Sequence, residues 1–202
     1  MIAGIVLAAG SSRRMGSSKL LLPWGDGSTI VGTVVAALTG GGLRPVVVVV
    51  GGDSQGIEAA LGGAGVVIVP NPDPGSGDML GSIKVGLRAL EGEVEAAAVM
   101  PGDLPRIRPG TVAALVNARK QGAGGIIAPV YGGRRGHPVL IPREAWPEVV
   151  ALGPQDTLRT FLRRHASQIH IIEVDDPGIH ADIDTPADYD SGDRGRTGDG
   201  SR

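Results

Sequence analysis

Apolar residues along the chain form two alternating kinds of segment. Short, mainly apolar runs predict strands, and the run of five valines at 46–50 predicts a strand that is covered on both faces, as in a parallel sheet. Between these runs, apolar residues recur at three- and four-residue intervals, which predicts helices with one buried face. The runs that predict strands are 2–8, 45–50, 66–69, 96–100, 126–129 and 169–174. The segments that predict helices are 30–38, 57–61, 79–90, 109–118, 143–152 and 155–165.

The order of these segments predicts the fold class. Strands and helices alternate, which is typical of a single α/β domain with a mostly parallel sheet. A polar excursion at 131–136 returns through the apolar stretch 137–141, and this pattern predicts a hairpin. We place the domain at residues 1–190. Residues 191–202 contain no apolar side chain, so we expect them to form a disordered tail.

The composition excludes several classes of protein. The 202-residue chain has a formal net charge of −2, so no global basic field would hold nucleic acid. It contains no cysteine, which excludes disulfides, thiol chemistry and cysteine-bound zinc. Its four histidines show no metal-ligand spacing. We find no basic leader and no apolar run of about 18 residues, so we expect a cytoplasmic protein with no membrane contact.

The loop after the first predicted strand carries the strongest indication of chemistry. The small residues Ala8, Ala9 and Gly10 let the backbone approach a phosphate group, and Arg14 and Lys19 add positive charge. Five residues separate Gly10 from Gly16, which excludes a P-loop, and the G-x-G-x-x-G dinucleotide fingerprint is absent. The alternative is an ordinary loop between strand and helix, with its cations facing solvent.

A second candidate residue follows the predicted strand 96–100. Asp103 comes at the carboxyl end of this strand, where open α/β sheets bind their ligands. Because Mg²⁺ prefers one or two carboxylates together with phosphate oxygens and water, one aspartate here can form half of a magnesium site. Asp103 could instead cap the helix that starts at Pro109, but it lies too far upstream for that role.

Five short motifs follow one another along the chain. The first is G-x-S-x-R-M-G-x-x-K, from Gly10 to Lys19. The others are M-x-x-S-I-x-x-G-L at 79–87, G-D-x-P at 102–105, G-H-P-V-L at 136–140 and D-I-D-T-P-x-D-Y at 182–189. Together they resemble the motifs of nucleotidyltransferases of the MobA/MocA type, which attach CMP or GMP to the molybdenum cofactor. Asp78 stands where that pattern has a glycine.

The resemblance implies a Rossmann-like fold of the nucleotide-diphospho-sugar transferase type, with helices on both faces of the sheet. It implies that Asp103 and Asp182 hold Mg²⁺ and that Ser82 lies near the nucleotide base, although a serine there could simply bond to its own helix. The implied nucleotide-binding residues are Leu7, Ala8, Ala9, Gly10, Arg14, Lys19, Ser82 and Asp103, of which Arg14, Lys19 and Asp103 are the catalytic ones. The implied acceptor-binding residues are Arg134, Arg135, His137 and Asp184, with a hydrogen-bonded loop histidine as the alternative for His137.

The implied reaction is transfer of CMP from CTP to the terminal phosphate of molybdopterin or its molybdenum form, with release of pyrophosphate. Family members that use CTP read L-A-A-G in the first loop and those that use GTP read L-A-G-G, so Ala9 favours CTP. The product would serve a molybdoenzyme of the xanthine dehydrogenase type. The alternatives are a guanylyltransferase, a transferase acting on another phosphorylated acceptor such as a sugar phosphate, an NAD(P)H-dependent reductase of a small heteroaromatic, and a non-catalytic cofactor-binding chaperone.

Overall fold

The structure is a computed structural model that describes residues 1–10, 19–25, 27–52, 54–73 and 79–193. The expected phosphate contact Arg14 and the departure at Asp78 lie outside the described residues. Within the described part of the chain, no helix is long and apolar enough to cross a membrane.

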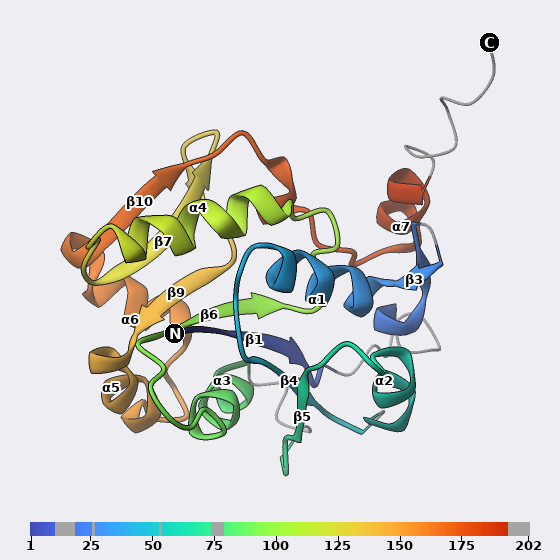
Figure 1. Ribbon diagram of the computed structural model, residues 1–202, viewed down its shortest axis with the longest axis horizontal. Coiled ribbons are helices and arrows are strands. Elements are labelled where there is room, and N and C mark those ends of the chain that lie inside the picture. Colours follow the sequence, from blue (N-terminus) through green and yellow to red (C-terminus); the bar gives the residue numbers. More distant parts are fainter. Residues whose placement is uncertain (11–18, 26, 53, 74–78, 194–202) are drawn as a thin grey trace.

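A central sheet runs through the whole molecule (Figure 1). Its strands are β1 (Ile2–Ala8), β4 (Val46–Val50), β5 (Val67–Pro70), β6 (Ala96–Pro101), β7 (Ile126–Tyr131), β8 (Arg134–Arg135), β9 (Val139–Pro142) and β10 (Ile169–Glu173). The order across the sheet is β10-β7-β9-β6-β1-β4-β5, with the short β8 paired to β7. Strands β5, β4, β1 and β6 are parallel, whereas β9 runs antiparallel to both β6 and β7. The expected mostly parallel sheet is confirmed.

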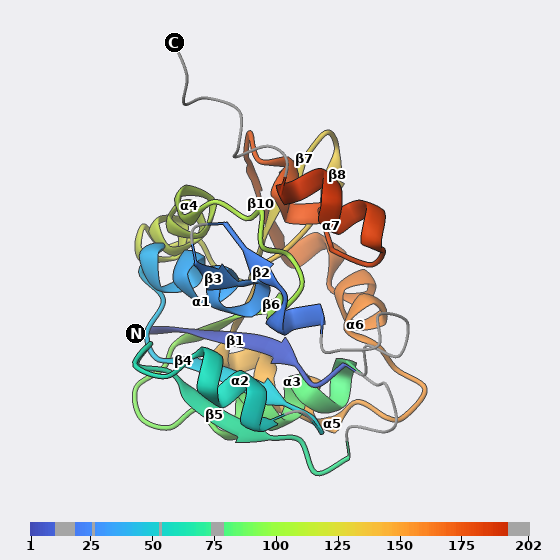
Figure 2. The same cartoon turned by 90° about the vertical axis from the view of Figure 1, so that its right-hand side faces the viewer.

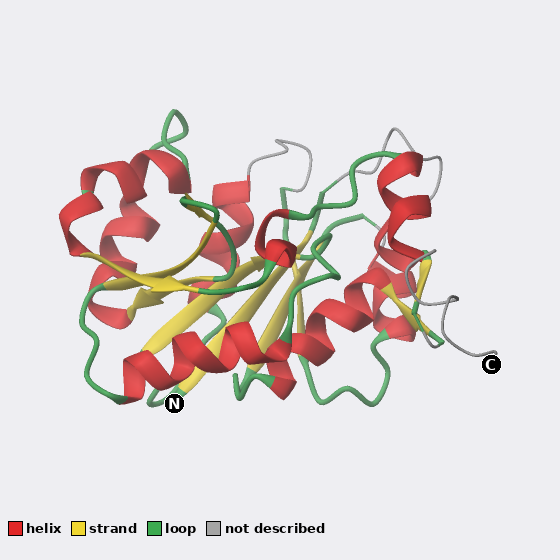
Figure 3. Cartoon of the chain, turned by 90° about the horizontal axis from the view of Figure 1, so that it is seen from above, coloured by secondary structure: helices red, strands yellow, loops and turns green. Residues whose placement is uncertain are grey.

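Helices cover both faces of this sheet, as expected (Figure 3). The helices are α1 (Ile30–Gly40), α2 (Ser54–Ala60), α3 (Met79–Arg88), α4 (Pro109–Lys120), α5 (Trp146–Ala151), α6 (Leu158–Arg164) and α7 (Pro186–Asp193). Buried side chains of α1, α2 and α4 pack on one face, and those of α3, α5 and α6 pack on the other. Along β1, Ile2 and Val6 face the first set while Ala3 and Ile5 face the second, which explains why this strand is apolar at every position.

Several helices differ in extent from the sequence prediction. The segment predicted as one helix over 143–152 is a 3₁₀ turn, Arg143–Ala145, followed by α5, because Pro147 lacks an N–H and fits only the first turn of a helix. Helix α6 is shorter than 155–165, since Thr157 caps it through a hydrogen bond from the main-chain N–H of Thr160. Helix α7 runs to Asp193, three residues past the domain end expected at 190.

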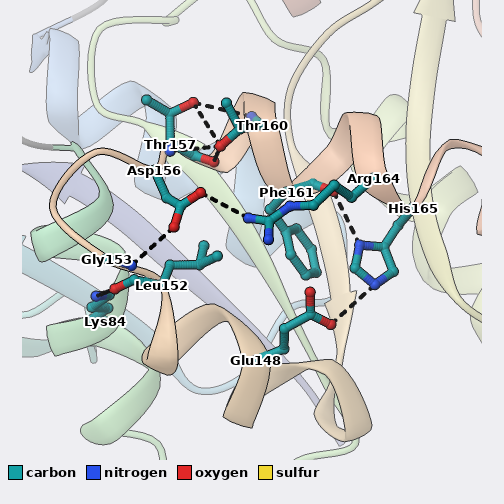
Figure 4. A network of polar contacts seen from close by, with 10 residues as sticks. All are labelled: Lys84, Glu148, Leu152, Gly153, Asp156, Thr157, Thr160, Phe161, Arg164 and His165. Atoms are coloured by element: carbon teal, nitrogen blue, oxygen red, sulfur yellow. Dashed lines mark hydrogen bonds and ion pairs between the residues drawn. The ribbon is translucent and has the colours of Figure 1, made fainter.

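A polar network fixes the segment between α5 and α6 (Figure 4). Lys84 of α3 donates to the main-chain oxygen of Leu152, and Asp156 accepts from Arg164 at 2.9 Å. His165 also contacts Glu148, with 3.1 Å between Nε2 and Oε2. These contacts hold α5 and α6 against α3, and none of the predicted site residues takes part in them.

The strand order places a topological switch point between β1 and β6. The chain moves from β1 outward to β4 and β5, and then returns to β6 on the other side of β1. In such sheets the loops after the two central strands diverge and leave a crevice at their carboxyl ends, where ligands bind. In Figure 2 the arrow of β1 points to the right, toward this edge of the sheet. The fold therefore predicts a ligand site beside the loops that follow Ala8 and Pro101.

Candidate active site

Lys19 joins two carboxylates at this edge of the sheet. It begins a 3₁₀ turn, Lys19–Leu21, that follows the first loop. Its Nζ lies 2.8 Å from Oδ2 of Asp103 and 2.9 Å from Oδ1 of Asp184. The Lys19 side chain is 16% exposed, against 23% for Asp103 and 58% for Asp184. Three segments far apart in the sequence thus meet at one ammonium group.

The charges at this edge favour binding of a further cation. Burial alone lowers the pKa of Lys19, but hydrogen bonds and charges from Asp103 and Asp184 outweigh it, so the pKa is raised and the ammonium stays protonated. Burial raises the pKa of Asp182, and the negative charges of Asp184 and Asp103 raise it further. Three carboxylates therefore lie near one another here, and two of them, Asp103 and Asp184, are paired with Lys19.

The donor set fits a magnesium ion that arrives with a nucleotide. Carboxylate oxygens of Asp103 and Asp182 are ligands that Mg²⁺ prefers. Among the residues that the structure describes, no group of three histidine, aspartate or glutamate side chains could hold a metal by itself. Because Mg²⁺ commonly completes its shell with phosphate oxygens and water, two aspartates are sufficient when a triphosphate is bound.

Close packing between the loops places Asp103. A Cβ on Gly102 would lie 3.0 Å from the main-chain oxygen of Leu7, so glycine lets the loops after β1 and β6 touch. The N–H of Gly102 donates to that same oxygen at 3.0 Å. The main-chain oxygen of Asp103 accepts from the N–H of Ile183 at 3.0 Å, which draws the segment 182–184 alongside.

The start of helix α7 orients Asp184. Oδ2 of Asp188 accepts from the hydroxyl of Thr185 at 2.7 Å and from its main-chain N–H at 2.8 Å, and it also accepts from the N–H of Asp184 at 3.3 Å. The Thr185 bonds hold the pKa of Asp188 below its ordinary value. In return, the Thr185 hydroxyl accepts from the N–H of Asp188 at 3.2 Å. This reciprocal cap fixes the backbone that carries Asp184.

A cluster that sequence reasoning missed ties α7 to the segment after Lys19. The hydroxyl of Tyr189 donates to the main-chain oxygen of Pro23 at 2.8 Å, and its ring lies 6.0 Å from that of Trp24. Arg106 lies over the Trp24 ring at 5.7 Å and donates to the main-chain oxygen of Asp188 at 2.7 Å. The D-Y ending of the last motif was the only signal for this contact.

Ser82 forms a buried polar pair with Asn71. The Ser82 oxygen accepts from Nδ2 of Asn71 at 3.1 Å. A Cβ on Gly86 would lie 2.5 Å from Cγ2 of Ile5, so α3 lies directly on β1. Ser82 is one turn earlier in α3, and the N–H of Asn71 donates to the last residue of β4, Val50, at 2.8 Å. The pair therefore lies toward the carboxyl edge of the sheet.

The expected acceptor residues do not form one group. His137 is half-buried, and its Nδ1 is buried without a hydrogen-bond partner among the described residues. Burial lowers the pKa of His137 and outweighs the opposing effects of a hydrogen bond to the main chain of Val99 and of the Asp103 charge, so the ring is neutral near pH 7. Arg134 and Arg135 form β8 at the same edge, and both side chains are exposed.

The fold defines an α/β protein with a mostly parallel sheet and a switch point between β1 and β6. The family model for the MobA-like NTP transferase domain matches residues 4–169. The chain belongs to this family.

Relatives over nearly the whole length differ in what they do. The chain is 28% identical to the molybdenum cofactor cytidylyltransferase of Escherichia coli K12, over 92% of each chain. It is 30% identical to the nicotine blue oxidoreductase of Paenarthrobacter nicotinovorans, over 91% of this chain and 92% of that protein. The crystal structure of Rv0371c from Mycobacterium tuberculosis H37Rv matches with a TM-score of 0.80 and 27% identity, covering 95% and 97% of the two chains. A structure of Rv0371c in complex with manganese matches with a TM-score of 0.77 and 26% identity, over 96% of this chain and 98% of that chain.

Proposed function

We propose that the protein transfers CMP from CTP to the terminal phosphate of molybdopterin or its molybdenum form, with release of pyrophosphate. The observation that carries this proposal is the meeting of Lys19, Asp103 and Asp184 at the switch point. Similarity to a molybdenum cofactor cytidylyltransferase over 92% of the chain supports the choice of reaction. The product would serve a molybdoenzyme of the xanthine dehydrogenase type.

The reaction needs alignment and neutralisation of charge more than acid–base groups. In this proposal the acceptor phosphate attacks the α-phosphorus of CTP in line, and the bond to the β,γ-pyrophosphate breaks. Lys19 and Arg14 bind the triphosphate and offset the negative charge that grows on the leaving group. Asp103 and Asp182 would hold Mg²⁺, which when bound supplies further neutralisation of the phosphate oxygens.

The base is selected beside the first loop. Ala9 adds a methyl group that narrows the space next to the loop, and a purine needs more of that space than a pyrimidine. A difference of one methyl group is worth about 1–3 kcal/mol in specificity. We place the base near Ser82, and we place the anionic acceptor toward His137 and the β8 arginines, Arg134 and Arg135.

The test is a panel of reactions with each nucleoside triphosphate, Mg²⁺ and molybdopterin. We expect CTP to give pyrophosphate and a cytidylylated pterin in equal amounts. If pyrophosphate forms only when molybdopterin is replaced by a sugar phosphate, the acceptor is a sugar phosphate and not molybdopterin. No pyrophosphate with any nucleotide and either acceptor would refute nucleotidyl transfer.

The similarity to nicotine blue oxidoreductase favours a second candidate, an NAD(P)H-dependent reductase of a small heteroaromatic. A reductase has no need for a lysine held between two carboxylates, which is why we rank this candidate second. Absorbance of NAD(P)H, followed with a heteroaromatic dye as the oxidant, separates the two functions. We expect no oxidation above the rate without protein.

A further inference from the structure

The ammonium group of Lys19 lies against the carboxylate of Asp103, which a bound metal ion would also contact. It contacts Oδ2 of Asp103 at 2.8 Å and Oδ1 of Asp184 at 2.9 Å. Asp103 is also a metal ligand in the proposed function, on which this inference rests. One aspartate is therefore required both as the partner of Lys19 and as a ligand of the metal.

These two uses of Asp103 oppose each other. A divalent ion on this carboxylate would lie close to the lysine ammonium, and positive charges a few ångströms apart repel strongly where water is partly excluded. Lys19 is mostly buried, so solvent screens this repulsion only in part. A metal ion that binds without nucleotide must either displace the Lys19 ammonium from Asp103 or bind close to it against this repulsion.

A triphosphate removes the conflict. Its oxygens are negatively charged, so they can replace Asp103 as the partner of Lys19 while they also bind the metal. Asp184 offers a second hold on the lysine, because its carboxylate is more exposed than that of Asp103 and its backbone is fixed by the cap of α7. Lys19 can then leave Asp103 without leaving the site.

We propose that Lys19 is the built-in counterion of Asp103 in the free protein, that the metal and the triphosphate together take it from Asp103, and that Asp184 tethers it throughout. Two consequences follow. Metal alone binds weakly, and metal and nucleotide each strengthen the binding of the other, as reciprocal coupling requires. Asp184 is then a positioning residue, since it acts through Lys19 and not on the substrate.

The first test measures binding of Mn²⁺ without nucleotide, from the electron paramagnetic resonance signal of the free ion. We expect Lys19→Met to bind Mn²⁺ roughly five- to tenfold more tightly than wild type, the gain expected when a competing ion pair is removed. Lys19→Arg keeps the charge and should match wild type. Lys84→Met is the matched control, because Lys84 bonds to Leu152 on another part of the fold. Equal or weaker binding by Lys19→Met, or no detectable binding to either protein, overturns the counterion role.

The second test is a double-mutant cycle for the tether, read as the affinity for CTP in the presence of Mn²⁺ and without acceptor. Asp184→Asn should weaken CTP binding about threefold or more in wild type and leave it unchanged in the Lys19→Met background. Equal losses in both backgrounds would overturn the tether. The Mn²⁺ test uses no nucleotide, and neither test uses an acceptor. If only the proposed reaction is wrong, Lys19→Met will still bind Mn²⁺ more tightly than wild type, while no CMP transfer is detected.

Discussion

Replacing Asp176 should destabilise the part of the fold that holds the segments carrying Asp103 and Asp182. Asp176 is 2% exposed and lies between the two segments that carry Asp103 and Asp182. Its Oδ2 accepts from the hydroxyl of Thr111 at 2.6 Å and from the N–H of Arg108 at 3.0 Å, at the start of α4. Its Oδ1 accepts from the N–H of Gly178 at 2.9 Å. Asp176→Ala would leave all three donors without this partner.

The magnitude follows from these bonds. Hydrogen bonds to a charged group contribute about 1.5–3 kcal/mol each, and they are not additive when they share one carboxylate. We therefore expect Asp176→Ala to lower the free energy of unfolding by about 3–5 kcal/mol. For a chain of this length, each kcal/mol corresponds to about 2–4 °C in Tm, so the expected fall is roughly 10 °C.

Calorimetry or circular dichroism on the ligand-free protein measures this change. Asp175→Ala is the matched control, because the neighbouring residue is exposed and Arg108 contacts only its main-chain oxygen. The control should stay within about 0.5 kcal/mol of wild type. A loss of less than about 1 kcal/mol in Asp176→Ala would show that this carboxylate does not brace the two segments.

Three further predictions concern the site. Asp103→Ala and Asp182→Ala should each abolish metal-dependent turnover with the fold intact by circular dichroism, and wild-type turnover in either would exclude the two-carboxylate site. The folded state raises the pKa of Asp182, so the charge of this carboxylate opposes folding above the ordinary pKa of aspartate. Asp182→Asn should therefore raise Tm at pH 7 and leave Tm unchanged near pH 2. The raised pKa of Lys19 has the opposite consequence: its contribution to stability is complete below the ordinary pKa of lysine and is lost as the pH rises through the raised value. Lys19→Met should therefore remove this alkaline loss from a Tm–pH profile.

The sequence predicted the layered fold because its signals are local. A strand such as β4 is five valines in a row, which only a site covered on both faces accommodates. The sequence also predicted Asp103 at the carboxyl end of a strand, where such sheets bind ligands, and the structure does bring Lys19 to this residue. The bond from Lys19 to Asp184 was not expected, since Asp184 had been placed with the acceptor residues.

The contacts that the sequence did not predict join residues far apart in the chain. Arg106 contacts Trp24 and the main chain of Asp188, and no local pattern marks an arginine for such a role. Asn71 follows a strand and precedes prolines, which is typical of a loop, and its bond to Ser82 depends on how closely α3 packs on β1. Packing between helices and strands decides which of these distant residues meet, and spacing along the sequence does not indicate that packing.

The proposed activity is the transfer of CMP from CTP to molybdopterin. The most direct measurement gives the protein Mg²⁺, molybdopterin and equal concentrations of CTP and GTP, and identifies the dinucleotide product by mass. We predict the cytidine product in at least about tenfold excess, and a smaller excess with Ala9→Gly, as expected for specificity that depends in part on one methyl group. A guanosine product in excess, or the absence of both products, would contradict the account.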